Sequence, residues 1–379
     1  MAPHAAGRGR RYSGVATRMS ALAPPVVPAV ASAATPVVRP AGRFLLGPWA
    51  DFAVLGPGFT LGGSALLAAL AAAGHLAVAS TIAFALTLMF VGPHYAATYR
   101  RAFASAAILR AHPVVTVVAP LGLLAWAVAA VHWPHTAGLA LFATYVTWAG
   151  YHYSGQSLGL AMLYPLRQGA RLQPCEKRLV AFPLYLSWLI SLLGLLRVGV
   201  AARNPAYELT RAALASSPLP AWVLGAGALA IAGSLSSVGL LAARRRRAGT
   251  PLPRQVWAVV ATQLLWFGIG LWNPFFNVVL VPVFHGAQYL AITSWHQTRG
   301  RSPSFFALYL LTVLVLGLLI NPGFAALGRA WGGEGPVVAA AVVAFLNLHH
   351  FLMDGRIWRL RERKVAESFA VAPAAGRVP

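Results

Sequence analysis

The feature that most constrains how this chain can fold is a series of long apolar segments separated by short basic ones. Hydrophobic residues make up 58% of the 379-residue sequence, and charged residues make up only 10%. A soluble protein of this length needs far more charge on its surface, so the composition indicates a polytopic membrane protein. The pattern predicts an all-α fold of about ten transmembrane helices, each long enough to cross ~30 Å of hydrocarbon, near residues 52–73, 77–96, 113–131, 137–164, 179–199, 220–243, 255–272, 274–296, 305–321 and 335–355.

The basic residues are distributed unevenly between alternate loops. The two termini and the loops after the second, fourth, sixth and eighth segments hold 26 of the 30 Lys and Arg residues. The positive-inside rule therefore predicts that both termini are cytoplasmic. We expect an integral protein of the bacterial inner membrane, whose formal charge of +23 serves topology and contacts to membrane lipids, and which binds no nucleic acid.

The ends of the chain are predicted to lie outside the membrane domain, which we place at residues 44–358. Residues 1–43 are rich in Ala, Pro, Arg and Ser and contain no acidic residue, as in a disordered basic tail. A transit peptide has a similar composition, and this alternative stays open. Residues 359–379 form a second basic tail. The single cysteine, Cys175, excludes an intrachain disulfide and any metal site with several cysteines.

Ionisable residues inside four of the apolar segments indicate a functional site. An ionisable residue in hydrocarbon is costly, so its presence there suggests function. The predicted metal ligands are His94, His152, His285, His349, His350 and Asp354. His75, His112, His132 and His135 lie at the ends of segments and are expected to be interfacial.

The spacing of neighbouring polar residues extends this prediction. His350 and Asp354 are four residues apart, so the carboxylate lies on the same helical face as the imidazole. Polar side chains also follow His152 and His285 at helical spacing, and we expect Gln156, Gln288 and Tyr289 to assist catalysis by orienting these rings. His349 points about 100° away from His350 and is predicted to act as a ligand or as an acid–base group.

The predicted topology places the histidines at two depths. All four histidine-bearing segments run from the outside to the cytoplasm. His94 and His350 lie about six residues before the next arginine, or roughly 10 Å, whereas His152 and His285 lie about 14 residues before it, or ~20 Å. This difference in depth is the main objection to a single site. His296 is too far along the helix from His285 to share a metal with it.

Several histidines with one carboxylate match the ligand preference of non-haem iron best, although copper and zinc are also compatible. A haem with histidine axial ligands is a further alternative for the cofactor. The first hypothesis is therefore a metal-dependent membrane oxidoreductase, an oxygenase or desaturase that acts on a lipid or another lipophilic small molecule and draws on an electron donor.

Two short segments, GPHYAAT around His94 and VFHGAQYL around His285, resemble the bacterial Brp/Blh carotene dioxygenases. The histidine boxes of the common membrane desaturases and hydroxylases are absent. The resemblance implies His94 and His285 as iron ligands and an isoprenoid-like substrate. The later segment of that family carries two histidines four residues apart, and here Tyr289 stands at the second position.

The sequence is also compatible with other functional classes. A proton-coupled transporter would use the buried His, Gln and Asp side chains as a polar path, although few polar residues lie on the outer side. A haem- or quinone-binding electron-transfer protein is a further alternative. A purely structural membrane subunit leaves the histidines unexplained.

Overall fold

A computed structural model describes residues 44–104, 106–196, 221–272, 276–330 and 335–360, together with residues 365, 368 and 369. The described part of the chain is helical and contains no strand, which confirms the all-α prediction. It lies within one compact unit that spans residues 38–379. The predicted N-terminal tail, residues 1–43, lies outside the described residues, as does most of the predicted C-terminal tail.

Each of the ten predicted segments overlaps one helix. The helices are α1 (Pro48–Ala50), α2 (Gly58–Ala72), α3 (Leu76–Phe103), α4 (Ala106–Ala111), α5 (Ala119–His132), α6 (Leu139–Arg167), α7 (Pro174–Leu196), α9 (Ala221–Arg247), α10 (Arg254–Trp272), α11 (Val281–Thr298), α12 (Pro303–Ala330) and α13 (Gly335–Ile357). One π-helical turn precedes each of α2, α5, α6 and α11, namely Asp51–Leu55, Val114–Val118, Pro134–Gly138 and Phe276–Leu280.

Six of the described helical stretches are long and apolar enough to cross a membrane: Leu76–Phe103, Val114–His132, Ala221–Arg247, Phe276–Thr298, Pro303–Ile320 and Val337–Ile357. A seventh span is possible if Pro48–Leu55 and Gly58–Ala72, which meet at 53°, are counted together. The length and composition of these helices are therefore those of a membrane protein. The count of ten spans and the side of each terminus stay predictions.

The helices differ in how much of their apolar surface they bury. Only 17% of the apolar stretch in α12 and 22% of that in Val114–His132 is buried, whereas the stretches in α11 and α13 are 72% and 67% buried. Apolar side chains that point outward are expected where a helix faces lipid. Helices α11 and α13 are therefore central, and α5 and α12 are peripheral.

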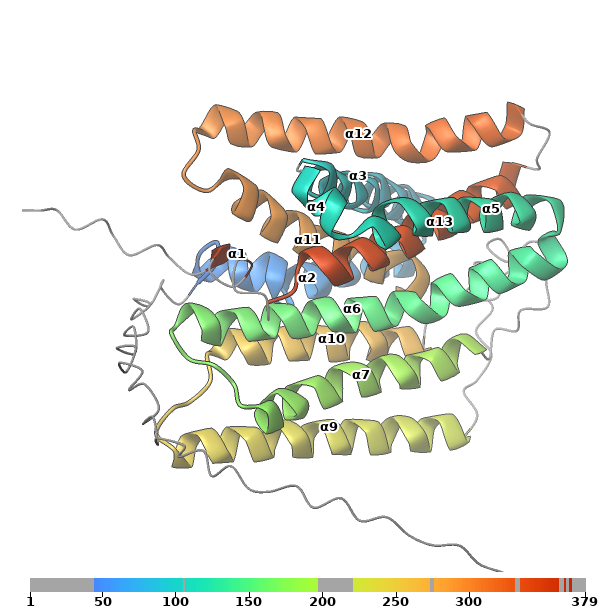
Figure 1. Cartoon of the computed structure of the whole chain (residues 1–379). Helices are drawn as coiled ribbons and strands as arrows, with labels where there is room; N and C mark the ends of the chain where they lie inside the picture. The colour runs from blue at the N-terminus through green and yellow to red at the C-terminus, as the bar shows by residue number, and fades with distance from the viewer. Residues whose placement is uncertain are drawn as a thin grey trace, which may run out of the picture. The chain divides into compact units, whose positions relative to one another are not determined.

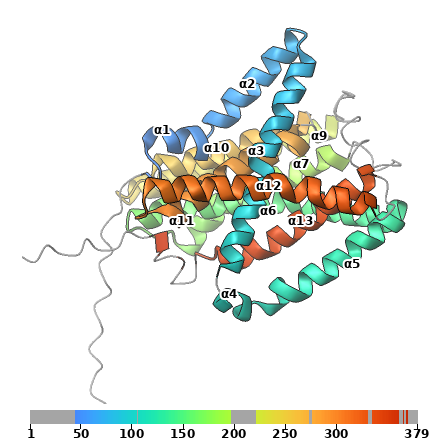
Figure 2. The ribbon, with the colours of Figure 1, turned by 90° about the horizontal axis from the view of Figure 1, so that it is seen from above.

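Figures 1 and 2 show how the central and peripheral helices pack against their neighbours. Helix α7 packs between α9 and α10, α6 packs on α7 and α10, and α13 contacts α3, α5, α6 and α12. Helix α3 crosses both α11 and α12. At the α3–α12 crossing, a side chain at Gly92 or at Gly317 would overlap the backbone of the other helix. Small residues permit such close contact between helices in membranes.

Candidate metal centre

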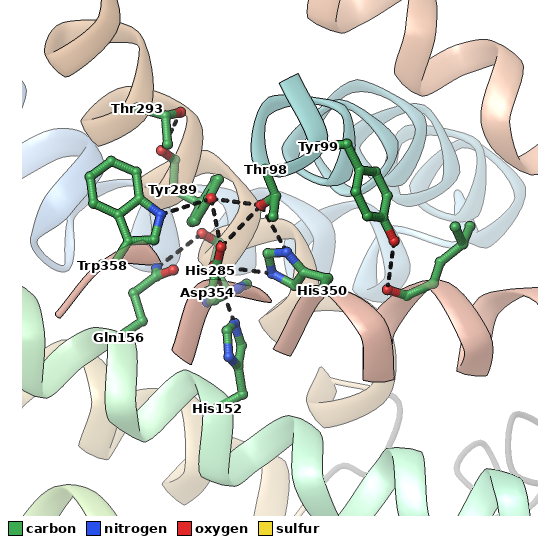
Figure 3. Close-up of polar contacts among 11 residues, drawn as sticks. Thr98, Tyr99, His152, Gln156, His285, Tyr289, Thr293, His350, Asp354 and Trp358 are labelled. Carbon is green, nitrogen blue, oxygen red and sulfur yellow. Dashed lines mark hydrogen bonds and ion pairs between the residues drawn. The ribbon is translucent and has the colours of Figure 1, made fainter. Parts of the chain in front are cut away.

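Four histidine rings, one from each of four helices, lie close together at the centre of the protein, and each ring is next to two of the others. They are His94 in α3, His350 in α13, His152 in α6 and His285 in α11. In that order, the ring centroids are 4.7, 4.9 and 5.1 Å apart, and the distance from His285 back to His94 is 5.5 Å. Figure 3 shows His350 and His285 beside Asp354, with His152 reaching toward them from α6.

The potential ligand atoms fall into two overlapping groups. The first group consists of one ring nitrogen each from His94, His285 and His350, and these three atoms lie within 4.8 Å of one another. The second group consists of one ligand atom each from His152, His350 and Asp354, which also lie within 4.8 Å of one another. His350 belongs to both groups. Since a metal–nitrogen bond is ~2.1 Å, two ligands of one ion are separated by at most about 4.2 Å. Small side-chain adjustments would therefore bring either group onto one ion. We call these five residues the His–Asp cluster.

A glycine beside the cluster allows two of its helices to approach closely. A Cβ atom at Gly286 would lie 2.7 Å from the carbonyl oxygen of Phe90 and 3.5 Å from Nδ1 of His94. The small residue therefore lets α11 lie directly against α3 at the level of His94 and His285. Any larger side chain at this position would push apart the helices that carry these two rings.

The cluster is buried, and several of its nitrogens have no hydrogen-bond partner. His94, His285 and His350 are at most 2% exposed, and Asp354 is 7% exposed. Among the described residues, buried nitrogens without a hydrogen bond include Nδ1 of His94, Nε2 of His152, both ring nitrogens of His285 and Nε2 of His350. A buried polar atom without a partner is costly. Unpartnered imidazole nitrogens that converge from four helices are what a bound metal ion would satisfy.

A hydrogen-bond network holds Asp354 beside His350. Tyr289 donates from its hydroxyl to Oδ1 of Asp354 at 2.9 Å, and Thr98 lies 3.2 Å from the same oxygen. Oδ2 of Asp354 lies 3.5 Å from Nε2 of His350 and 4.0 Å from Nε2 of His152. One carboxylate oxygen is thus occupied by protein donors, and the other faces the imidazoles.

The same network orients the ring of His350. Its Nδ1 lies 2.9 Å from the Thr98 hydroxyl. When Nδ1 carries the proton and donates it to Thr98, Nε2 keeps its lone pair for a metal. Partners of this kind fix the tautomer of a metal-binding histidine. Trp358 adds a further bond, from its indole N–H to the Tyr289 hydroxyl at 3.0 Å (Figure 3).

Aromatic side chains pack around the cluster. Phe351 stacks on His152 with centroids 4.4 Å apart, and Tyr153 lies 4.4 Å from the ring of His285. Tyr95 contacts His94 at 4.1 Å. These contacts restrict rotation of the rings.

Five of the six predicted metal ligands therefore come together in the His–Asp cluster, despite the predicted difference in depth. Helices α6 and α11 continue 15 and 13 residues beyond His152 and His285, whereas α3 and α13 continue only nine and seven beyond His94 and His350. Because the helices extend by different lengths past the cluster, the distance to the next arginine does not measure depth.

His349 is the predicted ligand that the structure does not bring to the cluster. Its Nδ1 lies 3.2 Å from the Tyr99 hydroxyl, and its Nε2 lies 3.0 Å from the carbonyl oxygen of Val115. Both ring nitrogens are occupied by protein atoms on the other face of α13. The structure therefore does not place His349 in the metal centre, where it was predicted as a ligand or an acid–base group, and its contacts are those of a residue that joins helices.

The predicted assisting residues have different contacts. Tyr289 bonds directly to Asp354. Gln156 contacts the backbone carbonyl of His285 at 3.3 Å rather than its ring, and Gln288 donates to the carbonyl of Leu55 at 2.8 Å. The two glutamines therefore link helices and do not fix the tautomers of the rings. Trp358 is not among the predicted site residues, although its position four residues after Asp354 places it on the same helical face.

A cavity of about 320 Å³ opens onto the cluster. His152, Asp354 and Tyr289 form one part of its wall, and Gln156, Thr293 and Arg359 also line it. Most of the remaining wall is apolar, with the aromatic residues Trp148, Tyr151, Tyr185, Phe351, Trp358 and Phe369. Its volume falls at the lower end of the range for small-molecule sites. A largely apolar wall with a few polar groups is typical of sites that bind a mostly apolar molecule in one orientation.

Comparison of the chain with protein-family models, curated proteins and solved structures finds no match.

Proposed function

We propose that the protein is an integral membrane metalloenzyme that holds an iron ion in the His–Asp cluster and oxidises a lipophilic substrate with dioxygen. The observation that carries the proposal is the convergence of unpartnered, buried imidazole nitrogens from α3, α6, α11 and α13. Histidines that serve only to join helices have protein partners on their ring nitrogens, as His349 does.

The ligand chemistry supports iron over the other candidate ions. Four imidazoles and one carboxylate supply nitrogen and oxygen ligands and no thiolate, a set that suits non-haem iron and is also compatible with copper or zinc. The rings pack around one point with neighbouring centroids no more than 5.5 Å apart. A porphyrin would have to occupy the space that neighbouring rings fill, so the geometry favours a bare ion over haem.

The cavity beside the cluster supports a lipophilic substrate. Its aromatic wall favours an apolar molecule, and its polar part places the reacting region next to His152 and Asp354. Membrane lipids or isoprenoid-like molecules fit this description. In the proposed topology of ten spans with cytoplasmic termini, the substrate reaches the cavity from the bilayer.

Each part of the site has a distinct role in this proposal. Iron would supply the activation of dioxygen. Thr98 and Tyr289 orient His350 and Asp354, while Phe351 and Tyr153 hold the rings of His152 and His285 and exclude water. Insertion of both oxygen atoms into the substrate needs no external electrons. Hydroxylation or desaturation takes two electrons and two protons from an electron donor.

The first experiment measures the metal in full-length protein purified in mild detergent without chelator. We expect about one equivalent of iron by elemental analysis in the wild type and in His349→Ala, and none in His350→Ala. Absence of metal from the wild type, even after iron is added back, would contradict the proposal.

The second experiment tests the reaction by incubating the iron-loaded protein with a membrane lipid extract under ¹⁸O₂. We expect a lipid product by mass spectrometry that carries ¹⁸O, or that has lost two hydrogens. If His350→Ala lost solute uptake into vesicles while the wild type consumed no dioxygen, the transporter alternative would be favoured instead.

A further inference from the structure

A second hollow lies on a different face of α11 from the cavity described above. It has a volume of about 560 Å³ and is bounded by α3, α11 and α12. The two hollows have no lining residue in common. Residues Ala287, Ala291 and Ser294 face this groove, whereas Tyr289, Ile292 and Thr293 face the cavity at the His–Asp cluster, as expected for opposite faces of one helix.

Helix packing explains why the groove exists. Helix α12 lies directly against α3 through Gly92 and Gly317 and has fewer contacts with α11. Short side chains on α11, Ala287 and Ala291, leave the space between α11 and α12 unfilled. The walls contributed by α3 and α12, including Phe90 and Leu310, are apolar.

Three polar residues near the end of α11 interrupt this apolar lining, namely Ser294, Thr298 and Arg299. The Thr298 hydroxyl donates to the Ser294 carbonyl oxygen at 2.7 Å. Ser294 is 5% exposed, lines the groove, and its hydroxyl has no hydrogen-bond partner. Arg299 lies at one end of the groove, where its guanidinium sits 5.2 Å from the centroid of the Trp295 ring. A buried hydroxyl without a partner in an apolar groove indicates a ligand with a polar group at that point.

The dimensions of the groove match one leaflet of a bilayer. Ala287 and Arg299 are twelve residues apart, or about 18 Å along a helix. Half of a ~30 Å hydrocarbon core is about 15 Å. Ala287 lies two residues after His285, so the groove runs from the level of the His–Asp cluster over about the length of one leaflet, and Arg299 is the charged residue in its lining among the residues that the structure describes.

From these observations, we propose that the groove between α3, α11 and α12 binds one anionic phospholipid. An acyl chain lies along Phe90, Ala291 and Leu310, an ester oxygen accepts a hydrogen bond from Ser294, and the phosphate pairs with Arg299. The formal charge of +23 favours an anionic lipid over a zwitterionic one. The proposal does not depend on the metal or on the reaction.

The proposal can be tested by native mass spectrometry of the full chain released from nanodiscs that contain equal amounts of phosphatidylglycerol and phosphatidylcholine. The wild type is expected to retain one phosphatidylglycerol in preference to phosphatidylcholine. Arg299→Gln should weaken this retention about fivefold, the effect of one basic residue at an anionic surface. Ala291→Phe should abolish retention by filling the groove.

The matched control is Arg301→Gln, because Arg301 is an exposed arginine two positions away that does not line the groove. It should retain the lipid like the wild type, and added inorganic phosphate should not displace the lipid. Equal loss in both arginine variants, equal retention of both lipids, or displacement by phosphate would overturn the proposal. Metal content is measured in every variant, and a loss of lipid with unchanged metal distinguishes this site from the His–Asp cluster.

Discussion

The two faces of α13 present neighbouring histidines to different surroundings. On one face, His349 contacts the Tyr99 hydroxyl and the Val115 carbonyl, so both of its ring nitrogens have protein partners. On the other face, Nε2 of His350 has no hydrogen-bond partner and lies beside His94, His152 and Asp354. Residue type, burial and position in the helix are nearly the same for the two histidines. A ring nitrogen without a hydrogen bond, among other such ring nitrogens, therefore distinguishes a candidate ligand from a buried structural histidine.

The sharpest test of this comparison replaces each histidine of the pair with alanine. His350→Ala should weaken metal binding by more than about 100-fold, since removal of a ligand costs more than removal of a residue that only orients one. His349→Ala should leave metal affinity unchanged. Metal titration of the purified variants measures both, and equal losses would show that the two faces do not differ in function.

Asp354→Asn tests whether the negative charge of the Asp354 carboxylate contributes to metal binding. The amide keeps the shape and an oxygen acceptor for Tyr289 but removes the negative charge, so we expect a loss of metal affinity of about 10- to 100-fold. Glu176→Gln is the control, because Glu176 pairs with Arg245 away from the cluster. Unchanged affinity in Asp354→Asn would remove this residue from the ligand set.

Tyr289→Phe removes a hydrogen bond to Asp354 while keeping the aromatic ring in place. Metal affinity should fall about tenfold, the lower end of the range for residues that orient a ligand. The control is Tyr99→Phe, which removes the phenol hydroxyl that contacts His349 on the other face. If both variants bound metal like the wild type, the network around Asp354 would have only a packing role.

The smallest expected effect is a decrease in the stability of the protein in His349→Gln. Loss of a contact between helices inside a membrane protein costs about 1 kcal/mol. Reversible unfolding in mixed detergent micelles should show this decrease to the same extent with and without metal. A decrease seen only in the metal-loaded protein would place His349 in the metal centre after all.

The His–Asp cluster could be predicted in large part because its chemistry is unusual for its surroundings. His94, His152, His285, His350 and Asp354 are ionisable residues in apolar segments, and such residues are rare without a role. Local spacing also predicted the pairing of His350 with Asp354, which lie one helical turn apart. The roles of Gln156 and Gln288 could not be predicted, because helical spacing gives the face of a side chain and not the neighbouring helix that it meets.

The sequence by itself determined that the chain is helical and apolar, because long uncharged segments leave the backbone no other way to satisfy its hydrogen bonds in lipid. It also determined which residue types could bind a metal. Only the tertiary structure decided that His350 and not His349 joins the cluster, and that His152 and His285 reach the same depth as His94. Those outcomes depend on how far each helix extends and where it crosses its neighbours, which are properties of packing between segments far apart in the chain.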